Sequence, residues 1–190
     1  MFFQQIIDKY YPADDNLRRL LLHHSRQVAD RALSIARRHP ELKADLIFLE
    51  NAAMLHDVGI YLTDAPSIHC MGSEPYLLHG RLGAELMRRE GAAEGRSTEE
   101  NQLCEAIARV CERHTGTGLT AQNIREQHLP LPEQDFLPET IEELIVCYAD
   151  KFYSKSHPER ERTVEQTAKS LEKFGHEGVV KFLGWAERFE

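Results

Sequence analysis

The feature that most constrains the fold is the spacing of the apolar residues, which recur every three or four positions along most of the chain. This spacing gathers them on one face of an α-helix. No segment shows a convincing alternation of apolar and polar residues, the pattern that is typical of a half-buried β-strand. The sequence therefore predicts an all-α protein, in which amphipathic helices bury their apolar faces against one another.

Breaker and capping residues set the boundaries of these helices. Pro12 ends a first helix over residues 2–10, and Asp14 or Asp15 can cap a long helix that runs to about Arg38. Gly59 is a natural terminator for a third helix. This third helix is expected at about 44–58, followed by a loop over 59–75 and by helices at about 76–90, 97–113 and 120–127. A further helix begins at 140, where Thr140 and Glu143 have capping-box spacing, and two more are expected after 156.

Composition excludes several classes of protein. At 190 residues, with 42% hydrophobic and 28% charged residues, the chain can form one domain with its own core. The formal net charge of -8 opposes binding to a nucleic-acid backbone. No apolar run approaches the roughly 20 residues of a membrane span, and the first residues do not resemble a signal peptide. We therefore expect a cytoplasmic protein with no nucleic-acid or membrane partner.

Histidines and aspartates interrupt the apolar faces of the predicted helices at intervals along the chain. Taken singly, such a histidine is more often a hydrogen-bonded core residue than a metal ligand. Taken together, buried imidazoles and carboxylates would be costly unless a cation lay between them. The candidate metal ligands are His24, His56, Asp57, His79, His114 and Asp150.

The chemistry of these side chains narrows the choice of metal. Imidazole nitrogen combined with carboxylate oxygen suits Fe, Mn, Co, Ni or Zn better than calcium. Six ligands exceed the need of one open site, so we expect one or two divalent transition-metal ions. His56 and Asp57 point about 100° apart on a helix, and the two oxygens of Asp57 can bridge neighbouring ions. Such a pair of ions can clamp both oxygens of a phosphoryl displacement.

This ordered series resembles the H…HD…H…H…D ligands of the HD-domain metal-dependent phosphohydrolase superfamily, and "HDVG" at 56–59 resembles its HDIG variant. The similarity extends over about residues 21–152 and is greatest with small stand-alone bacterial members, including diadenosine tetraphosphate hydrolases. It implies a helical bundle of the HD-domain type. It also implies one metal on His24, His56, Asp57 and Asp150, and a second on His79, His114 and the bridging Asp57.

Two positions depart from the family pattern. Ile60 stands where many HDIG proteins have a basic residue, which removes one phosphate contact. Thr115 follows His114 where a second histidine would otherwise be expected, which argues against the cyclic-dinucleotide phosphodiesterase branch. Basic residues close to the proposed ligands are weaker candidates for binding substrate phosphate, and they are Lys151, Arg113, Arg81 and Arg26.

The leading hypothesis is a phosphohydrolase that cleaves a phosphate ester or anhydride with a metal-activated hydroxide. Asp57, His79 and His114 are the predicted catalytic residues, and Asp57 and Asp150 are candidates to accept the proton of the water. The expected partner is a small phosphorylated substrate, with a nucleotide as the leading candidate. The alternatives are an HD-type di-iron oxygenase and a metal-stabilised binding module without turnover.

We expect a single HD domain over residues 1–190. Its ligand-bearing core spans about 14–155, and the C-terminal helices at about 156–190 pack on that core. The sequence leaves the oligomeric state open, with a homodimer as one option.

Overall fold

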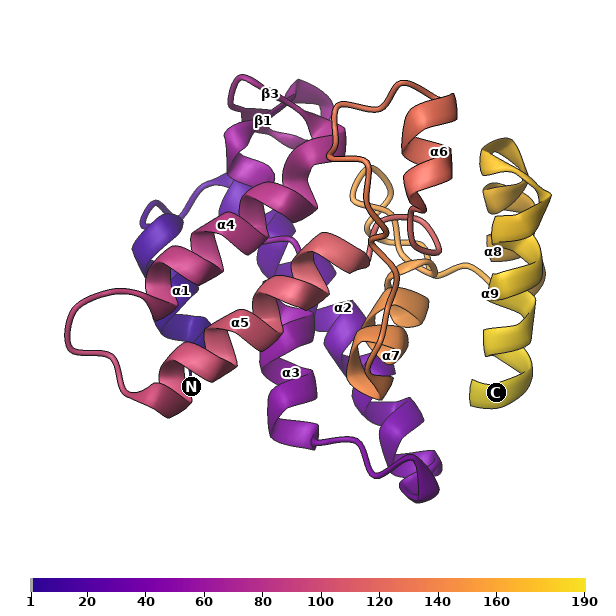
Figure 1. Cartoon of the computed structure of the whole chain (residues 1–190), viewed down its shortest axis with the longest axis horizontal. Helices are drawn as coiled ribbons and strands as arrows, with labels where there is room; N and C mark the ends of the chain where they lie inside the picture. Colours follow the sequence, from indigo (N-terminus) through magenta and orange to yellow (C-terminus); the bar gives the residue numbers. More distant parts are fainter. Residues whose placement is uncertain (1) are drawn as a thin grey trace.

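A computed structural model describes residues 2–190, and its backbone is predominantly helical (Figure 1). The α-helices in this range are α1 (Phe2–Tyr10), α2 (Asn16–Arg38), α3 (Leu46–Leu55), α4 (His79–Gly91), α5 (Thr98–Arg113), α6 (Ala121–Glu126), α7 (Ile141–Asp150), α8 (Val164–Leu171) and α9 (His176–Phe189). The predicted all-α class is confirmed.

The helices begin where their capping residues predict. The side chain of Asp15 accepts a hydrogen bond from the backbone N–H of Arg18 at 2.8 Å, which starts α2. The hydroxyl of Thr140 likewise accepts from the backbone N–H of Glu143 at 3.2 Å. The second half of that capping box is absent, because the Glu143 carboxylate accepts instead from the backbone N–H of Glu139 at 2.8 Å.

The segment between α3 and α4, predicted as a loop, contains a small β-sheet. Its strands are β1 (Thr63–Ala65), β2 (Cys70–Met71) and β3 (Glu74–Pro75). The middle strand β1 pairs antiparallel with β2 and parallel with β3. Strands of two or three residues are too short to show an alternating pattern, so the prediction of a loop over 59–75 missed them.

The third helix ends earlier than predicted, and Gly59 has a different role. Helix α3 stops at Leu55, and Gly59 has an ordinary right-handed backbone with φ -85°. A Cβ atom at Gly59 would lie 2.4 Å from both the backbone nitrogen of Gly83 and the carbonyl oxygen of His79. Gly59 is therefore needed because α4 passes directly against this turn. That close packing brings the His56–Asp57 pair beside His79.

The central helices pack around a common core. Helix α2 packs against α3 and α7, and α4 lies along α5 (Figure 1). Gly80 makes the close α4–α5 approach possible, because a Cβ there would lie 2.4 Å from the carbonyl oxygen of Cys111. All four cysteines are buried free thiols.

Helices α8 and α9 contact each other and lie at one side of the central helices (Figure 1). Phe182 of α9 stacks on Tyr148 of α7 with ring centroids 5.2 Å apart. The side chain of Arg38, at the end of α2, donates to the carbonyl oxygen of Phe189 at 3.1 Å. None of the helices in residues 2–190 combines the length and the apolar character needed to cross a bilayer.

Candidate metal centre

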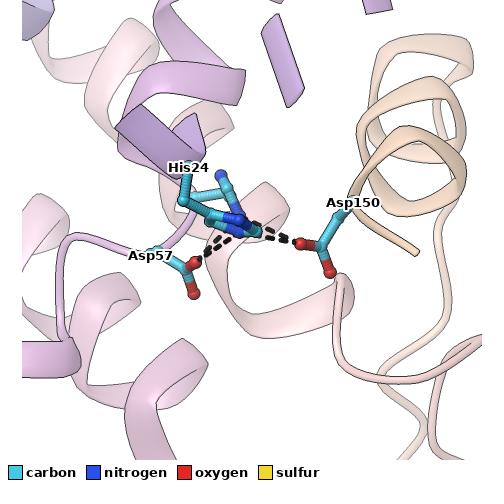
Figure 2. A group of neighbouring side chains, drawn as sticks. His24, Asp57 and Asp150 are labelled. Carbon is cyan, nitrogen blue, oxygen red and sulfur yellow. Dashed lines mark hydrogen bonds and ion pairs between the residues drawn. The ribbon is translucent and has the colours of Figure 1, made fainter. Parts of the chain in front are cut away.

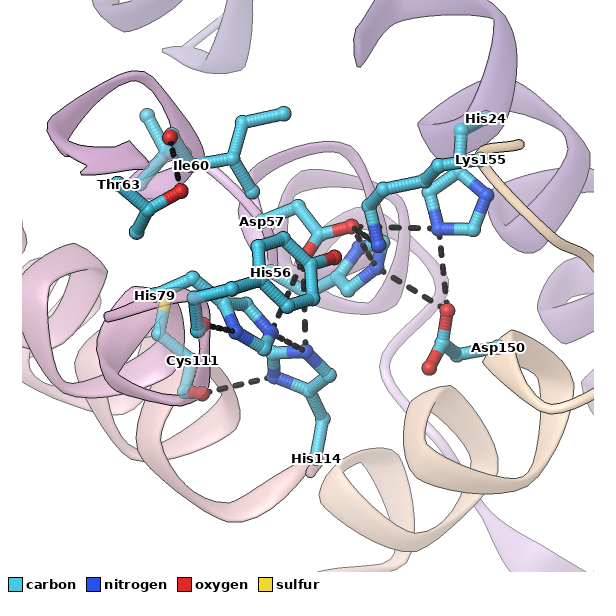
Figure 3. A network of polar contacts seen from close by, with 12 residues as sticks. His24, His56, Asp57, Ile60, Thr63, His79, Cys111, His114, Asp150 and Lys155 are labelled. Atoms are coloured by element: carbon cyan, nitrogen blue, oxygen red, sulfur yellow. Dashed lines mark hydrogen bonds and ion pairs between the residues drawn. The ribbon is translucent and has the colours of Figure 1, made fainter. Parts of the chain in front are cut away.

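The predicted ligands come together at one place in the fold (Figure 3). His24 lies within α2, His56 and His114 directly follow α3 and α5, His79 begins α4, and Asp150 ends α7. Two overlapping groups of side chains have ligand atoms within 4.8 Å of one another. They are His24, His56, Asp57 and Asp150, and Asp57, His79 and His114.

Three of the histidines are oriented by the same local device. The Nδ1 atoms of His56, His79 and His114 each lie 2.7 Å from a carbonyl oxygen three residues earlier, that of Ala53, Tyr76 and Cys111 respectively. A carbonyl oxygen can only accept, so Nδ1 carries the hydrogen in each bond. The other ring nitrogen, Nε2, is then free to face the centre. This is the usual arrangement of a metal-binding histidine.

Asp57 lies between the two groups of histidines. Its Oδ2 is 3.0 Å from Nε2 of His56 and 3.2 Å from Nε2 of His24. Its Oδ1 is 3.4 Å from Nε2 of His79 and 3.5 Å from Nε2 of His114. Each carboxylate oxygen therefore faces one group, which is the geometry that a bridging ligand requires.

Asp150 completes the first group from the opposite side. Figure 2 shows His24 between the two carboxylates, with its Nε2 3.0 Å from Oδ1 of Asp150. The same oxygen lies 3.5 Å from Nε2 of His56. Because α2 and α7 pack together, the carboxylate reaches the histidines although the sequence separation between His24 and Asp150 is 126 residues.

Two observations test whether these residues suit a metal. Within residues 2–190, neither oxygen of Asp57 receives a well-aligned hydrogen bond, although the side chain is fully buried. The Nε2 atoms of His79 and His114 lie 3.1 Å apart, and in the neutral rings both carry lone pairs because Nδ1 holds the hydrogen. Converging lone pairs and carboxylate oxygens without a well-aligned hydrogen bond fit a shared cation, and the cluster is able to hold a divalent metal.

The protonation states of the site differ between its two groups of ligands. Burial would raise the pKa of Asp57, but the charges of His56 and Lys155 outweigh it and hold the pKa well below its usual range. Burial lowers the pKa of His56, yet Asp57 and Asp150 prevail and raise it to about 9. Burial lowers the pKa of His79 to about 3, so this imidazole is neutral at pH 7. Neutral imidazole is the form that binds a metal, so His79 can bind one directly, whereas His56 would release its proton on binding.

Lys155 is the residue of the site that the sequence analysis missed. Its Nζ lies 2.5 Å from Oδ2 of Asp57, and its side chain is 12% exposed (Figure 3). Asp57 raises the pKa of Lys155 against the opposing effect of burial, so the side chain stays charged. Lys155 follows α7 in an irregular segment, where no helical spacing marks a residue as inward-facing. The one related sequence signal is Ile60, a buried apolar residue at the position where many HDIG proteins have a basic residue, and it does not identify the segment that supplies the positive charge.

The four predicted phosphate-binding residues have different surroundings. Lys151 donates to Oδ2 of Asp150 at 2.6 Å and to the carbonyl oxygen of His114 at 2.9 Å. The others are held in ion pairs with glutamates: Arg113 with Glu139 and Glu143, Arg81 with Glu85, and Arg26 with Glu50. Only Lys151 of these four lines the cavity beside the metal centre, so the structure does not bring the three arginines to it.

That cavity has a volume of about 630 Å³. His79 and Asp150 form the part of its wall that belongs to the metal centre, and Tyr76 and Tyr153 line it as well. Tyr76 stacks on the His79 ring with centroids 4.7 Å apart. The volume lies within the range of about 300 to 1,000 Å³ that is usual for sites binding small molecules.

The helices enclose a buried cluster of histidines and aspartates that is able to hold a metal, and comparison with known proteins identifies the family of the chain. The model of the HD domain family matches residues 21–154, which is more than half of the chain. The chain belongs to the HD domain family. Membership supports metal-dependent phosphohydrolysis as the general class of activity.

The individual relatives compared with this chain share less than a third of their residues with it over the matched regions. The chain is 26% identical over 169 residues to a tRNA (cytidine(56)-2'-O)-methyltransferase of Thermoplasma volcanium, a match that covers 89% of this chain but only 41% of that protein. It is 29% identical to an uncharacterised protein of Methanocaldococcus jannaschii, covering 80% and 75% of the two chains. The HD domain of the L. monocytogenes phosphodiesterase PgpH superposes with a TM-score of 0.49 at 18% identity, covering 82% of this chain and 76% of that one.

Proposed function

We propose that this protein is a metal-dependent phosphohydrolase that cleaves a phosphate ester or anhydride in a small phosphorylated metabolite, with a nucleotide as the leading substrate class. The observation that carries the proposal is the position of Asp57. Its two oxygens face two separate groups of nitrogen ligands at 3.0 to 3.5 Å. One or two divalent metals bound there would activate water and neutralise charge on the phosphoryl group.

The protein's own residues have distinct roles in this proposal. His24, His56, Asp57 and Asp150 would hold one ion, and His79 and His114 would share Asp57 with the other. The carbonyl bonds to Nδ1 of His56, His79 and His114 keep their Nε2 atoms aimed at the centre. Asp57 and Asp150 are the carboxylates placed to accept the proton of an attacking water.

Two lysines provide positive charge beside the carboxylates. Lys151 contacts Asp150, and Lys155 contacts Asp57. Both side chains are close enough to the ligand cluster to attract a phosphate oxygen. Lys155 thereby supplies, from a segment far along the chain, the cation that Ile60 does not provide.

The charge of the protein and the residues around the site favour a small substrate over a long polynucleotide. Two relatives are named as tRNA methyltransferases, but the matches cover only 41% and 38% of those proteins. The net charge of -8 opposes a long phosphate backbone, whereas a few lysines at one cavity suit a small anion.

The test is elemental analysis of the purified protein, followed by phosphate-release assays on a panel of nucleotides and phosphate esters with added Mn²⁺, Fe²⁺, Co²⁺ or Ni²⁺. We expect bound transition metal and metal-dependent phosphate release. Protein that contains no metal and gains none from these additions would contradict the proposal. Substrate-dependent oxygen uptake in place of phosphate release would replace it with an oxygenase.

A further inference from the structure

The cavity beside the metal centre extends to the C-terminal helices, and this part of it differs from the rest. Residues of α8, α9 and the turn between them line the cavity, namely Ser170, Leu171, Lys173, Phe174, Gly175, His176, Glu177, Gly178 and Lys181. All of them lie beyond residues 21–154, the part of the chain that matches the family. This wall is therefore a candidate for features specific to this chain.

The C-terminal wall is packed firmly against the loop that follows the metal ligand His114. A Cβ atom at Gly178, in the first turn of α9, would lie 3.1 Å from the hydroxyl of Thr117. Thr117 is itself buried and lines the cavity. Further along α9, Phe182 is fully buried and stacks on Tyr148. The wall is thus a part of the packed fold that faces the same cavity as the metal ligands.

Basic side chains line this cavity from the metal centre to the C-terminal wall. Arg162 donates one hydrogen bond to the backbone carbonyl oxygen of Lys151 at 3.3 Å, and Arg162, Lys151 and Asp150 all line this cavity. Lys173 and Lys181 line the other part of the wall, and Lys181 pairs with Glu177 at 3.0 Å. Within residues 2–190, Arg162 and Lys173 form no ion pair with a carboxylate, so their charges are available to a ligand.

We propose that Arg162 and Lys173 bind a second phosphate group of the substrate, which is therefore a compound with at least two phosphates, such as a nucleoside diphosphate or triphosphate. This inference rests on the proposed function, because it takes the metal centre as the site of the phosphate that is cleaved. A guanidinium is well suited to phosphate, since its planar donors can bind two oxygens at once.

The aromatic residues of the cavity are suited to binding a nucleoside, which would form the rest of such a substrate. Tyr153 lines the cavity beside Arg162, and Phe174 stands at its C-terminal wall with 67% of its surface exposed. An exposed aromatic ring at the edge of a cavity offers a flat apolar face on which a base can stack.

The experiment measures binding by calorimetry to the metal-loaded full chain, using probes that cannot be cleaved between the two phosphates. We compare α,β-methylene-ADP with AMP, and methylenediphosphonate with inorganic phosphate. The wild type should bind the two-phosphate member of each pair roughly tenfold more tightly, as two added charge contacts of about 0.7 kcal/mol each would give. Equal affinity for both members, or no binding of any probe, would overturn the inference.

The variants assign this preference to particular residues. Arg162→Gln with Lys173→Gln should abolish the preference and leave the affinity for AMP within about twofold. Lys169→Gln, at an exposed position of α8 outside the cavity, is the matched control and should bind like the wild type. If Arg162→Gln impairs folding, Lys173→Gln alone should still lose part of the preference, because Lys173 is exposed. A double variant that keeps the full preference would disprove the assignment.

Hydrolysis assays separate this inference from the proposed function. Phosphate release with wild-type KM in the folded double variant would uphold the phosphohydrolase and reject the second-phosphate site. A two-phosphate preference that the double variant loses, without phosphate release from any member of the panel, would uphold the second-phosphate site and reject the phosphohydrolase.

Discussion

Two buried carboxylates in this protein have opposite surroundings. Glu90 is 4% exposed, and its Oε1 accepts a hydrogen bond from Lys9 at 2.6 Å and another from the hydroxyl of Tyr10. Asp57 is completely buried, and Lys155 forms an ion pair with its Oδ2 at 2.5 Å. Its Oδ1 faces the Nε2 atoms of His79 and His114 at 3.4 and 3.5 Å, and within residues 2–190 neither oxygen accepts a well-aligned hydrogen bond. The first carboxylate is satisfied by the fold, which is what structural burial requires.

The difference distinguishes a structural ion pair from a candidate functional site. Glu90 holds α1 against α4 with donors that the chain itself supplies. Asp57 combines with histidine lone pairs that point at one another, an arrangement that a bound cation would stabilise. The burial of a charged side chain therefore indicates a functional site only when its hydrogen-bond and ion-pair partners within the protein are known as well.

The largest expected effect comes from removing the bridging carboxylate. Asp57→Ala should abolish metal binding and lower the rate of phosphate release by more than the roughly 100-fold that follows loss of a residue supporting a metal ligand. Elemental analysis and the phosphate assay measure these two effects, and helical circular dichroism should persist. Full activity in this variant would end the proposal, and metal loss in Glu90→Gln would remove the contrast between the two carboxylates.

Lys155→Met should destabilise the metal-free protein by about 3 to 5 kcal/mol, because it leaves the buried charge of Asp57 without its ammonium partner. Adding Mn²⁺ should restore much of this loss, since the metal supplies positive charge at the same carboxylate. Urea unfolding with chelator and then with Mn²⁺ measures both quantities. Lys169→Met is the exposed control, and an equal loss of stability in both variants would remove Lys155 from the site.

Glu90→Gln should lower the free energy of unfolding by about 1 to 3 kcal/mol, because the neutral amide loses the charge that strengthens the hydrogen bond from Lys9. Metal content and phosphate release should stay at wild-type levels. Chemical denaturation beside elemental analysis checks this prediction. A variant as stable as the wild type would show that the Glu90 pair contributes nothing measurable.

The smallest effect is a pH dependence assigned to Glu90. Burial raises its pKa, but the bonds from Lys9 and Tyr10 outweigh burial and hold the pKa below the ordinary value of 4.5. A depressed pKa in the folded state adds stability above pH 4.5, and this contribution is lost as the pH falls through the folded-state pKa. Between pH 6 and pH 3, unfolding midpoints of the wild type should therefore fall more steeply than those of Glu90→Gln. Parallel curves would contradict the assignment.

Much of the fold and of the candidate metal centre could be predicted from local sequence signals. The spacing of apolar residues marks the helices, and Asp15 marks the start of α2 through its hydrogen bond to Arg18. The histidines were recognisable as candidate ligands only when taken together with Asp57 and Asp150, because a single histidine on an apolar face is more often a core residue. Helical periodicity points His24 inward, whereas His56 and His114 lie just beyond the ends of α3 and α5. The short strands escaped prediction because pairing between β1 and its neighbours, rather than any local pattern, defines them.

The sequence by itself determined the helical class and which side chains could serve as ligands, because both depend on contacts between residues three or four positions apart. Only the tertiary structure decided that Lys155 reaches Asp57, that Gly59 is needed for the close approach of α4, and that α8 and α9 wall the cavity. These features depend on how distant segments pack, and no spacing along one segment encodes which distant residue it will meet.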